Sequence, residues 1–305
     1  MITVLPGLHL GSASDAADVQ RLQASGVTHV LTMDSEVPDG LGLFHTKFVQ
    51  ILDDDCADLL SYLPECVGFV KEALEVPSSS VLVHCHAGVS RSAAVVTAYL
   101  MNTCGITLQD ACSRLQTLKP DIRMNEEFLR QLSMYEAMGC DVDITCASYK
   151  QYRLQKVTEK YPELQKLPRE IFASDPSSAG QSSEVLYRCR KCRRSLFRAG
   201  SILDHTEDTR PAAFAHKRMT PVQTAISTKC TSYFVEPVQW MEEALLGVMN
   251  GQLLCPKCNA KLGSFNWFGE QCSCGRWVTP AFQVHKNRVD EAKGVQIRGI
   301  TTTKR

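Results

Sequence analysis

The sequence lacks a hydrophobic segment long enough to cross a membrane. Its richest apolar stretch, residues 93–101, is far shorter than the roughly 20 residues that a bilayer requires. The N-terminus also lacks a basic region followed by an apolar core and a small-residue cleavage site, so we expect no secretory signal. We therefore expect no membrane association and a reducing location, in the nucleus and cytoplasm (cytosol).

Net charge is missing as well, because 33 Lys and Arg balance 33 Asp and Glu. This balance hides an asymmetry between the two halves of the chain. Residues 1–140 hold 8 basic and 17 acidic side chains, for a net charge of −9, whereas residues 141–305 hold 25 and 16, for +9. Opposite charges on two halves indicate two parts with different tasks, and 305 residues are enough for two ordinary domains.

Cysteine, in contrast, is abundant, with 14 residues in the chain. Without a secretory signal, metal binding and catalysis explain this number better than disulfides do. Seven of the cysteines lie at or before residue 146, scattered among helix-like and strand-like segments. The other seven lie between residues 189 and 274 in paired spacings.

The pattern of apolar residues divides the chain into four parts. Residues 1–140 alternate short strand candidates (27–32, 46–52, 81–84) with amphipathic helix candidates (15–24, 59–74, 92–102, 108–118, 126–138). Such alternation predicts an α/β domain with a mainly parallel central sheet flanked by helices. Residues 141–185 predict a helical arm and a Ser/Pro/Gly-rich linker. Residues 186–287 predict a small β-rich domain, and residues 288–305 a tail.

The most informative segment is VLVHCHAGVSRSAAVV, residues 81–96. It places Cys85, five further residues and Arg91 between an apolar strand and an apolar helix. A loop of this length can point its backbone N–H groups inward at one tetrahedral anion, with the helix N-terminus adding its positive end. The Arg91 guanidinium can grip two anion oxygens. The expected anion-binding residues are His86, Ala87, Gly88, Val89, Ser90 and Arg91.

The same donors favour the thiolate form of Cys85, since thiolates are stabilised at helix N-termini beside cations. We expect this thiolate to attack phosphorus and form a phosphocysteine intermediate, without any cofactor. Ser92 is placed to donate to the sulfur when it becomes the leaving group, and His84 to tune the loop's hydrogen bonds. A buried structural cysteine with a chance arginine is the alternative, but the flanking strand, HAG, SRS and helix favour catalysis.

HCHAGVSRS resembles the signature of the cysteine-dependent protein tyrosine phosphatases, and the SRS form and small domain resemble their dual-specificity branch. The resemblance implies hydrolysis of phosphotyrosine and phosphoserine/threonine in phosphoprotein substrates. In the family, an Asp on a loop before the cysteine is the general acid. Matching the helix YLPECVGFV to the family pattern places this acid on Asp53, with Asp54 as second choice. Asn125 matches an Asn that supports the phosphate loop, although it could equally cap the following helix.

The second half carries two Cys-x-x-Cys pairs, and a tight turn in each lets both thiolates face one metal ion. We therefore assign a first zinc ion to Cys189, Cys192, Cys255 and Cys258. A second would take His205, Cys230, Cys272 and Cys274, with His216 as an alternative to His205. Closed sites of four protein ligands are typically structural, so we expect both ions to stabilise the fold.

The segments CRKCRRSLF, CPKCNAKLGSFNW and CSCGRWVTPAFQVHKNRVD resemble the C-terminal zinc-binding domain of one dual-specificity phosphatase. This resemblance implies two zinc ions and a role in late maturation of the large ribosomal subunit. The basic half is compatible with RNA or pre-ribosomal contact, but also with a solvated surface or one that meets the acidic half. The alternative function is a ribosome-assembly scaffold for which phosphatase activity is dispensable. A phosphatase for RNA ends or lipids is disfavoured, because the loop holds no additional Lys.

Overall fold

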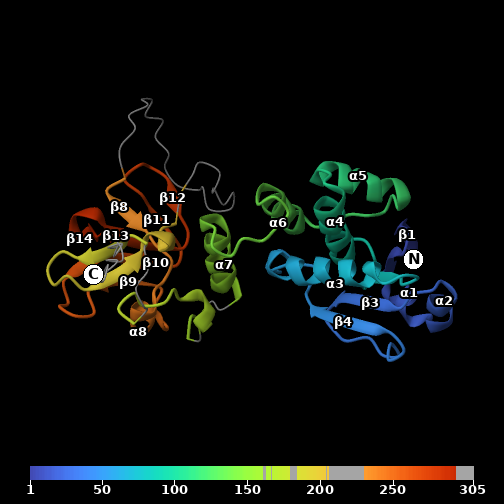
Figure 1. The fold of residues 1–305 in the computed structure, drawn as a ribbon. Coiled ribbons are helices and arrows are strands. Elements are labelled where there is room, and N and C mark those ends of the chain that lie inside the picture. The colour runs from blue at the N-terminus through green and yellow to red at the C-terminus, as the bar shows by residue number, and fades with distance from the viewer. Residues whose placement is uncertain (161–162, 166, 179–183, 204, 206–229, 293–305) are drawn as a thin grey trace, which may run out of the picture. The chain divides into compact units, whose positions relative to one another are not determined.

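The computed structural model describes residues 1–160, 163–165, 167–178, 184–203, 205 and 230–292. The chain separates into two compact units, Met1–Asp143 and Ile144–Arg305 (Figure 1). Within the described residues, no helix combines the length and the apolar character needed to cross a membrane.

The first unit is built on a five-stranded sheet in the order β1-β2-β5-β3-β4. Every neighbouring pair in this sheet is parallel except the hairpin of β1 and β2. The predicted mainly parallel sheet is thereby confirmed. The first two strands were not predicted from the sequence. β1 has only four residues, and β2 contains His9, Gly11 and Ser12, so neither shows a clear strand pattern. The strands are β1 (Ile2–Leu5), β2 (Leu8–Ser12), β3 (His29–Asp34), β4 (His45–Gln50) and β5 (Val81–Cys85).

Helix α4 (Arg91–Cys104) lies at the centre of this unit. It packs against β5, β2 and β3 and against three neighbouring helices, so every residue from its start to Met101 is buried (Figure 1). Because this helix is enclosed on all sides, its sequence is apolar on every face and lacks the single apolar stripe of a surface helix. The remaining helices are α1 (Ala13–Ala17), α2 (Val19–Ala24), η1 (Leu60–Tyr62), α3 (Leu63–Glu75), α5 (Leu108–Leu118) and α6 (Glu126–Ala137).

In its described residues, the second unit contains three small antiparallel sheets, which confirms the predicted β-rich domain. Their strand orders are β8-β13-β10-β9, β11-β12 and β14-β6-β7. The strands are β6 (Leu186–Cys189), β7 (Ser195–Arg198), β8 (Ser232–Phe234), β9 (Asn250–Leu254), β10 (Lys261–Asn266), β11 (Glu270–Gln271), β12 (Trp277–Val278), β13 (Ala281–His285) and β14 (Val289–Ala292). The helices are α7 (Ala147–Lys160), η2 (Arg169–Ile171), η3 (Ala199–Ser201), η4 (Gln239–Met241), α8 (Glu242–Leu245) and η5 (Lys286–Arg288).

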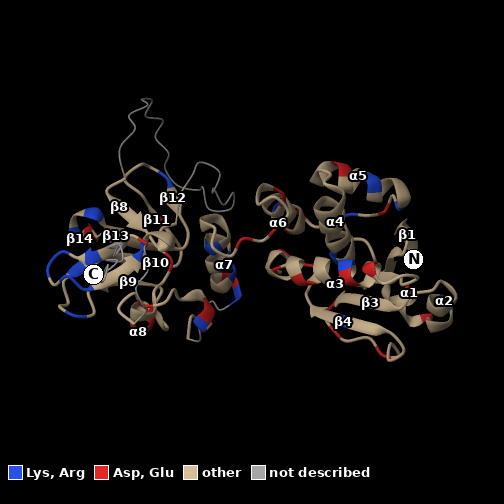
Figure 2. Cartoon of the chain, in the orientation of Figure 1, with Lys and Arg blue, Asp and Glu red and all other residues tan. Residues whose placement is uncertain are grey.

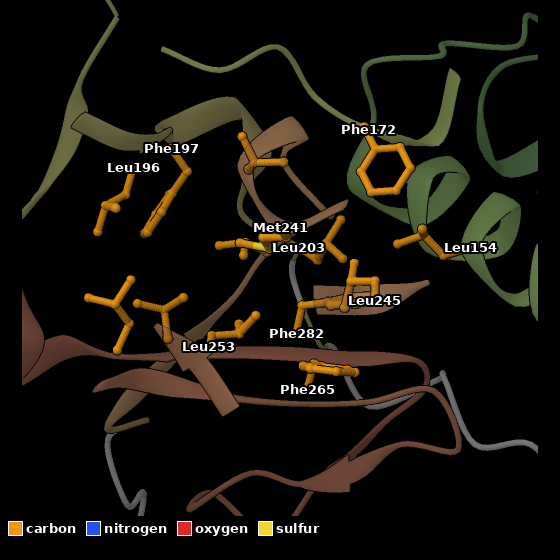
Figure 3. Packing of buried hydrophobic residues seen from close by; sticks show 14 of the residues in the cluster. Leu154, Phe172, Leu196, Phe197, Leu203, Met241, Leu245, Leu253, Phe265 and Phe282 are labelled. Atoms are coloured by element: carbon orange, nitrogen blue, oxygen red, sulfur yellow. The ribbon is translucent and has the colours of Figure 1, made fainter. Parts of the chain in front are cut away.

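Residues 141–185 were predicted as an arm and linker, but several described residues between 144 and 178 lie in the core of this unit. Leu154 of α7 and Phe172 lie in one buried cluster with Phe282 of β13 (Figure 3). Farther along, Asp175 forms an ion pair with Arg194 at 2.6 Å. The charged composition of α7 hid the apolar stripe by which it packs, so the prediction of a separate arm is corrected here.

The predicted tail also begins too early at residue 288. β14 pairs with β6 in antiparallel register, and Val289 is buried opposite Cys189. One buried valine followed by two acidic residues makes too weak a strand pattern for the sequence to mark. Residues 293–305 lie outside the described part of the chain.

Candidate active site and metal sites

The loop between β5 and α4 brings the predicted nucleophile together with its hydrogen-bond donors. Cys85 is the last residue of β5 and is only 1% exposed. Its Sγ accepts hydrogen bonds from the backbone N–H of Gly88 and from the hydroxyl of Ser92, each at 3.2 Å. Sulfur at this point therefore has two donors that stabilise a negative charge on it.

Gly88 is held where no other residue fits. Its φ of 69° is left-handed, and an added Cβ would lie 2.5 Å from the carbonyl oxygen of Gly11. The first residue of α1, directly after β2, makes a second contact with the loop, because the Ala13 N–H donates to the His86 carbonyl at 3.0 Å. On the other side, the Arg123 N–H donates to the Val89 carbonyl at 3.1 Å. The loop is thus fixed by backbone contacts from segments distant in sequence.

Arg91 begins α4 and is largely buried. Its Nη1 donates to Oδ1 of Asp34 at 2.8 Å and to the carbonyl of Ile51 at 3.3 Å. Its Nε is buried and has no hydrogen-bond partner among the residues that the structure describes. A buried guanidinium N–H without a partner is costly, so this nitrogen is a donor available to an anion in the loop.

Asp53, the predicted general acid, contacts the phosphate loop through its carboxylate. Its Oδ1 accepts hydrogen bonds from the Ser90 hydroxyl and from Nδ2 of Asn125, both at 2.7 Å. Oδ1 of Asn125 meanwhile accepts the Phe128 N–H at 2.7 Å and so caps α6. Oδ1 of Asp54 instead accepts the N–H of Cys56 in its own loop, at 3.1 Å.

His84 directly precedes Cys85 on β5 and is buried. Its Nε2 is 2.8 Å from the Thr32 hydroxyl on the neighbouring strand β3. Burial lowers the pKa of His84 below its ordinary value, with smaller opposing contributions from the Cys85 backbone and the Asp34 charge. A neutral imidazole in this place fits a hydrogen-bonding role rather than proton transfer.

In the second unit, two groups of four metal-ligating side chains converge. Sulfur atoms from the two Cys-x-x-Cys pairs form the first group, Cys189, Cys192, Cys255 and Cys258. The second comprises His205, Cys230, Cys272 and Cys274, and in both groups the donor atoms lie within 4.8 Å of one another. These are the two sets that the sequence predicts, whereas His216 lies outside the described residues.

The spacing of these donors suits a tetrahedral ion. Zinc–sulfur bonds of about 2.3 Å at tetrahedral angles would separate two sulfur ligands by about 3.8 Å. The Cys189–Cys258 and Cys192–Cys255 sulfur distances are 3.8 Å and 3.5 Å. In the second group, Nε2 of His205 lies 3.3 Å from the sulfurs of both Cys230 and Cys274. All of these cysteines are free rather than disulfide-bonded.

Both Cys-x-x-Cys pairs form the predicted turn, and each turn contains a left-handed residue that the sequence did not reveal. Arg193 and Asn259 each follow the second cysteine and have left-handed φ values of 64° and 53°. The Arg193 N–H donates to the Cys189 carbonyl, and the Asn259 N–H to the Cys255 carbonyl, at 2.8 and 2.9 Å. The spacing predicted a turn, but Arg or Asn at this position does not indicate a left-handed conformation as clearly as glycine would. Asp34, Ile51 and Gly11 were likewise missed at the loop, since no motif includes them.

Comparison with known proteins agrees with this geometry. Residues 8–138 match the family model described as dual specificity phosphatase, catalytic domain. The chain belongs to the dual specificity protein phosphatases, which confirms the enzyme class that the loop motif predicts. It is 59% identical to human dual specificity protein phosphatase 12, over 100% of this chain and 92% of that protein. It is 31% identical to tyrosine-protein phosphatase YVH1 of Saccharomyces cerevisiae, over 94% and 90%. Both matches extend through the second unit as well.

Proposed function

We propose that the first unit hydrolyses phosphoproteins through a covalent phosphate on Cys85. The observation that carries this proposal is the Cys85 sulfur, buried at the end of β5 with donors from Gly88 and Ser92. The thiolate attacks phosphorus, and the bond from phosphorus to the substrate oxygen breaks. Phosphocysteine and the dephosphorylated side chain are the products of this first step.

Asp53 supplies the proton in this first step. Protonated Asp53 gives its proton to the departing oxygen and becomes a carboxylate. In the second step this carboxylate removes a proton from water, which attacks phosphorus and displaces the Cys85 thiolate. The Ser92 hydroxyl then stabilises the leaving sulfur, and inorganic phosphate is released. Proton and electron pairs balance over the cycle, so the enzyme returns to its starting state.

The loop and Arg91 stabilise the charge that the phosphoryl oxygens carry during both transfers. Backbone N–H groups and the guanidinium are fixed in place before the substrate arrives, so they need little reorganisation in the transition state.

Substitution of Cys85 tests this scheme. We expect Cys85→Ser to reduce hydrolysis of p-nitrophenyl phosphate to background while still binding tungstate, because the anion donors remain. Cys104→Ser, at an exposed cysteine of the same unit, is the matched control and should keep normal turnover. Wild-type-like turnover by Cys85→Ser would exclude the scheme.

We also infer that zinc occupies the two ligand groups of the second unit. A set of four sulfurs, and a set of three sulfurs with one imidazole, suit zinc and leave no position open for a substrate. When bound, the ions would cross-link hairpins of the unit and contribute to its folding free energy. No catalytic step is assigned to them.

A second function, contact with the pre-ribosomal large subunit, is proposed on the resemblance of the C-terminal segments. Its physical support is positive charge near β14, where Figure 2 shows Lys and Arg. Lys286 and Arg288 lie in η5 directly before this strand, and the Arg190 and Arg193 side chains contact Asp290 within it. Such a surface attracts RNA phosphates. This role would place the protein in both nucleus and cytoplasm.

Genetic rescue separates the two functions. In cells that lack the protein, we would compare Cys85→Ser with a chain that ends at residue 185. Full rescue by Cys85→Ser and failure of the shortened chain would favour the scaffold role. Failure of Cys85→Ser would show that phosphoryl transfer is the needed activity.

A further inference from the structure

We propose that Asp34 is a positioning residue for phosphoryl transfer, which acts by holding the Arg91 guanidinium in its phosphate-binding orientation. The proposal rests on the proposed function, since it presumes that Arg91 binds the phosphoryl group. Asp34 is the last residue of β3 and does not belong to the loop motif.

The contact between the two side chains is short and shielded from water. Nη1 of Arg91 lies 2.8 Å from Oδ1 of Asp34, and the side chains are 10% and 16% exposed. Attraction between charges is screened much less at such a site than on the surface. The Ile51 carbonyl accepts from the same nitrogen at 3.3 Å, so one end of the guanidinium is held by two acceptors.

Asp34 is itself fixed by the sheet. Oδ1 also accepts the N–H of Ser35 at 2.9 Å, and the backbone of Asp34 is in register with Gln50 on β4. On the other side, β3 pairs with β5, where Thr32 lies opposite His84. The carboxyl ends of these parallel strands therefore lie together, and Asp34 is anchored beside the strand that ends at Cys85.

The occupied nitrogen decides which donors remain for phosphate. With Nη1 bound to Asp34 and Ile51, Nε stays buried without a partner among the described residues. Arginine binds phosphate best through two parallel N–H groups, which requires a fixed guanidinium plane. Without Asp34, the long side chain would regain rotamer freedom, and a small misplacement at a reacting centre can cost on the order of 100-fold in rate.

Charge and anchoring have opposite effects, which makes the proposal testable. Removing the Asp34 charge leaves Arg91 less neutralised and so strengthens anion binding, whereas removing the acceptor loosens the guanidinium. Asp34→Asn keeps an acceptor oxygen and removes the charge, while Asp34→Ala removes both. If Asp34 acts by anchoring, catalysis should decrease from wild type to Asn to Ala. If its charge merely opposes anion binding, both variants should bind anions more tightly.

The experiment uses the full-length protein with p-nitrophenyl phosphate as substrate and tungstate as competitive inhibitor. We expect Asp34→Ala to lower kcat about 10- to 100-fold and to weaken tungstate inhibition, with KM changed only a few-fold, because the lost contact acts mainly in the transition state. Asp34→Asn should lower kcat by about 3- to 10-fold, a smaller loss than in Asp34→Ala, because it keeps an acceptor oxygen. The Asn variant also keeps the proposal testable if the Ala variant does not fold. Asp39→Ala, an exposed acid after the same strand, should match wild type.

A double-mutant cycle shows whether Asp34 acts through Arg91. The Arg91→Lys background lacks the guanidinium that Asp34 would hold. In this background, adding Asp34→Ala should lower kcat by less than about 3-fold. Wild-type kcat and tungstate inhibition in both Asp34 variants, or an undiminished loss beside Arg91→Lys, would overturn the proposal. If Cys85→Ser were also fully active, the proposed function itself would fail. Inactive Cys85→Ser with fully active Asp34 variants would reject Asp34 alone.

Discussion

At the scale of single residues, Asp53 and Asp54, two of the three adjacent acids in residues 53–55, have different surroundings. Asp53 receives hydrogen bonds from Ser90 and Asn125, whereas Asp54 binds an N–H of its own loop. We expect Asp53→Ala to lower kcat/KM, which reports the first transfer, by about 100- to 10,000-fold for phosphates with poor leaving groups, and much less for p-nitrophenyl phosphate. Steady-state kinetics across a series of aryl and alkyl phosphates would measure this dependence. Asp54→Ala is the control and should stay within a few-fold; a larger loss there would move the acid to Asp54.

His84 predicts a pH dependence of stability. Its pKa in the folded state is lowered from 6.5 by burial, so below pH 6.5 the unfolded chain takes up a proton that the folded protein resists. Stability attributable to His84 is therefore complete above pH 6.5 and decreases as pH falls from 6.5 towards the lowered pKa. An NMR titration of the imidazole should give a midpoint below 6.5. A midpoint at or above 6.5 would show that His84 does not experience the burial described here.

At the scale of elements, six of the eight metal-ligating residues lie at the turns of hairpins. Cys189 and Cys192 connect β6 to β7, and Cys255 and Cys258 connect β9 to β10. Cys272 and Cys274 lie between β11 and β12, where Gly275 supplies a third left-handed turn residue, with φ of 87°. An ion in the first group would tie a hairpin of one sheet to a hairpin of another. An ion in the second would tie residues 205 and 230 to the hairpin of β11 and β12.

Metal content tests the two ligand groups separately. We expect purified protein to hold about two zinc ions per chain, since each group offers four donors. Cys255→Ser should lower the zinc of the first group, and His205→Ala that of the second, each leaving about one ion. Elemental analysis by mass spectrometry measures these values. About one ion in the wild type, with His205→Ala unchanged, would contradict the second site.

Motifs and contacts made in the folded state differ in how far the sequence reveals them. Cys85, Arg91 and six of the metal-ligating residues stand in short spacings that chemistry explains, so they could be predicted. Cys230 and His205 followed from the number of ligands that a second four-coordinate site needs. Asp34 and Gly11 reach the loop only because the sheet places β3 and β2 beside β5. The packing stripe of α7 and the single buried valine of β14 are likewise visible only once their partners are known.

At the scale of the whole molecule, the chain divides into two units with separate cores. Among the described residues, both groups of metal-ligating side chains belong to the second unit, whereas the proposed catalytic residues belong to the first. Chelation should therefore destabilise one unit and spare the other. We expect a strong zinc chelator to lower or abolish one thermal transition in calorimetry, while hydrolysis of p-nitrophenyl phosphate persists. Activity lost in parallel with zinc would contradict this independence.

The central claim, a covalent phosphate on Cys85, can be tested by trapping the intermediate. Asp53→Ala lacks the base that activates water, so it should accumulate phosphocysteine from p-nitrophenyl phosphate, whose leaving group needs little protonation. Rapid quenching followed by mass spectrometry of peptides locates the phosphate. We expect a burst of about one nitrophenol per chain and phosphate on Cys85, with neither in Cys85→Ser. Phosphate on another residue, or turnover with no labelled peptide, would contradict the account.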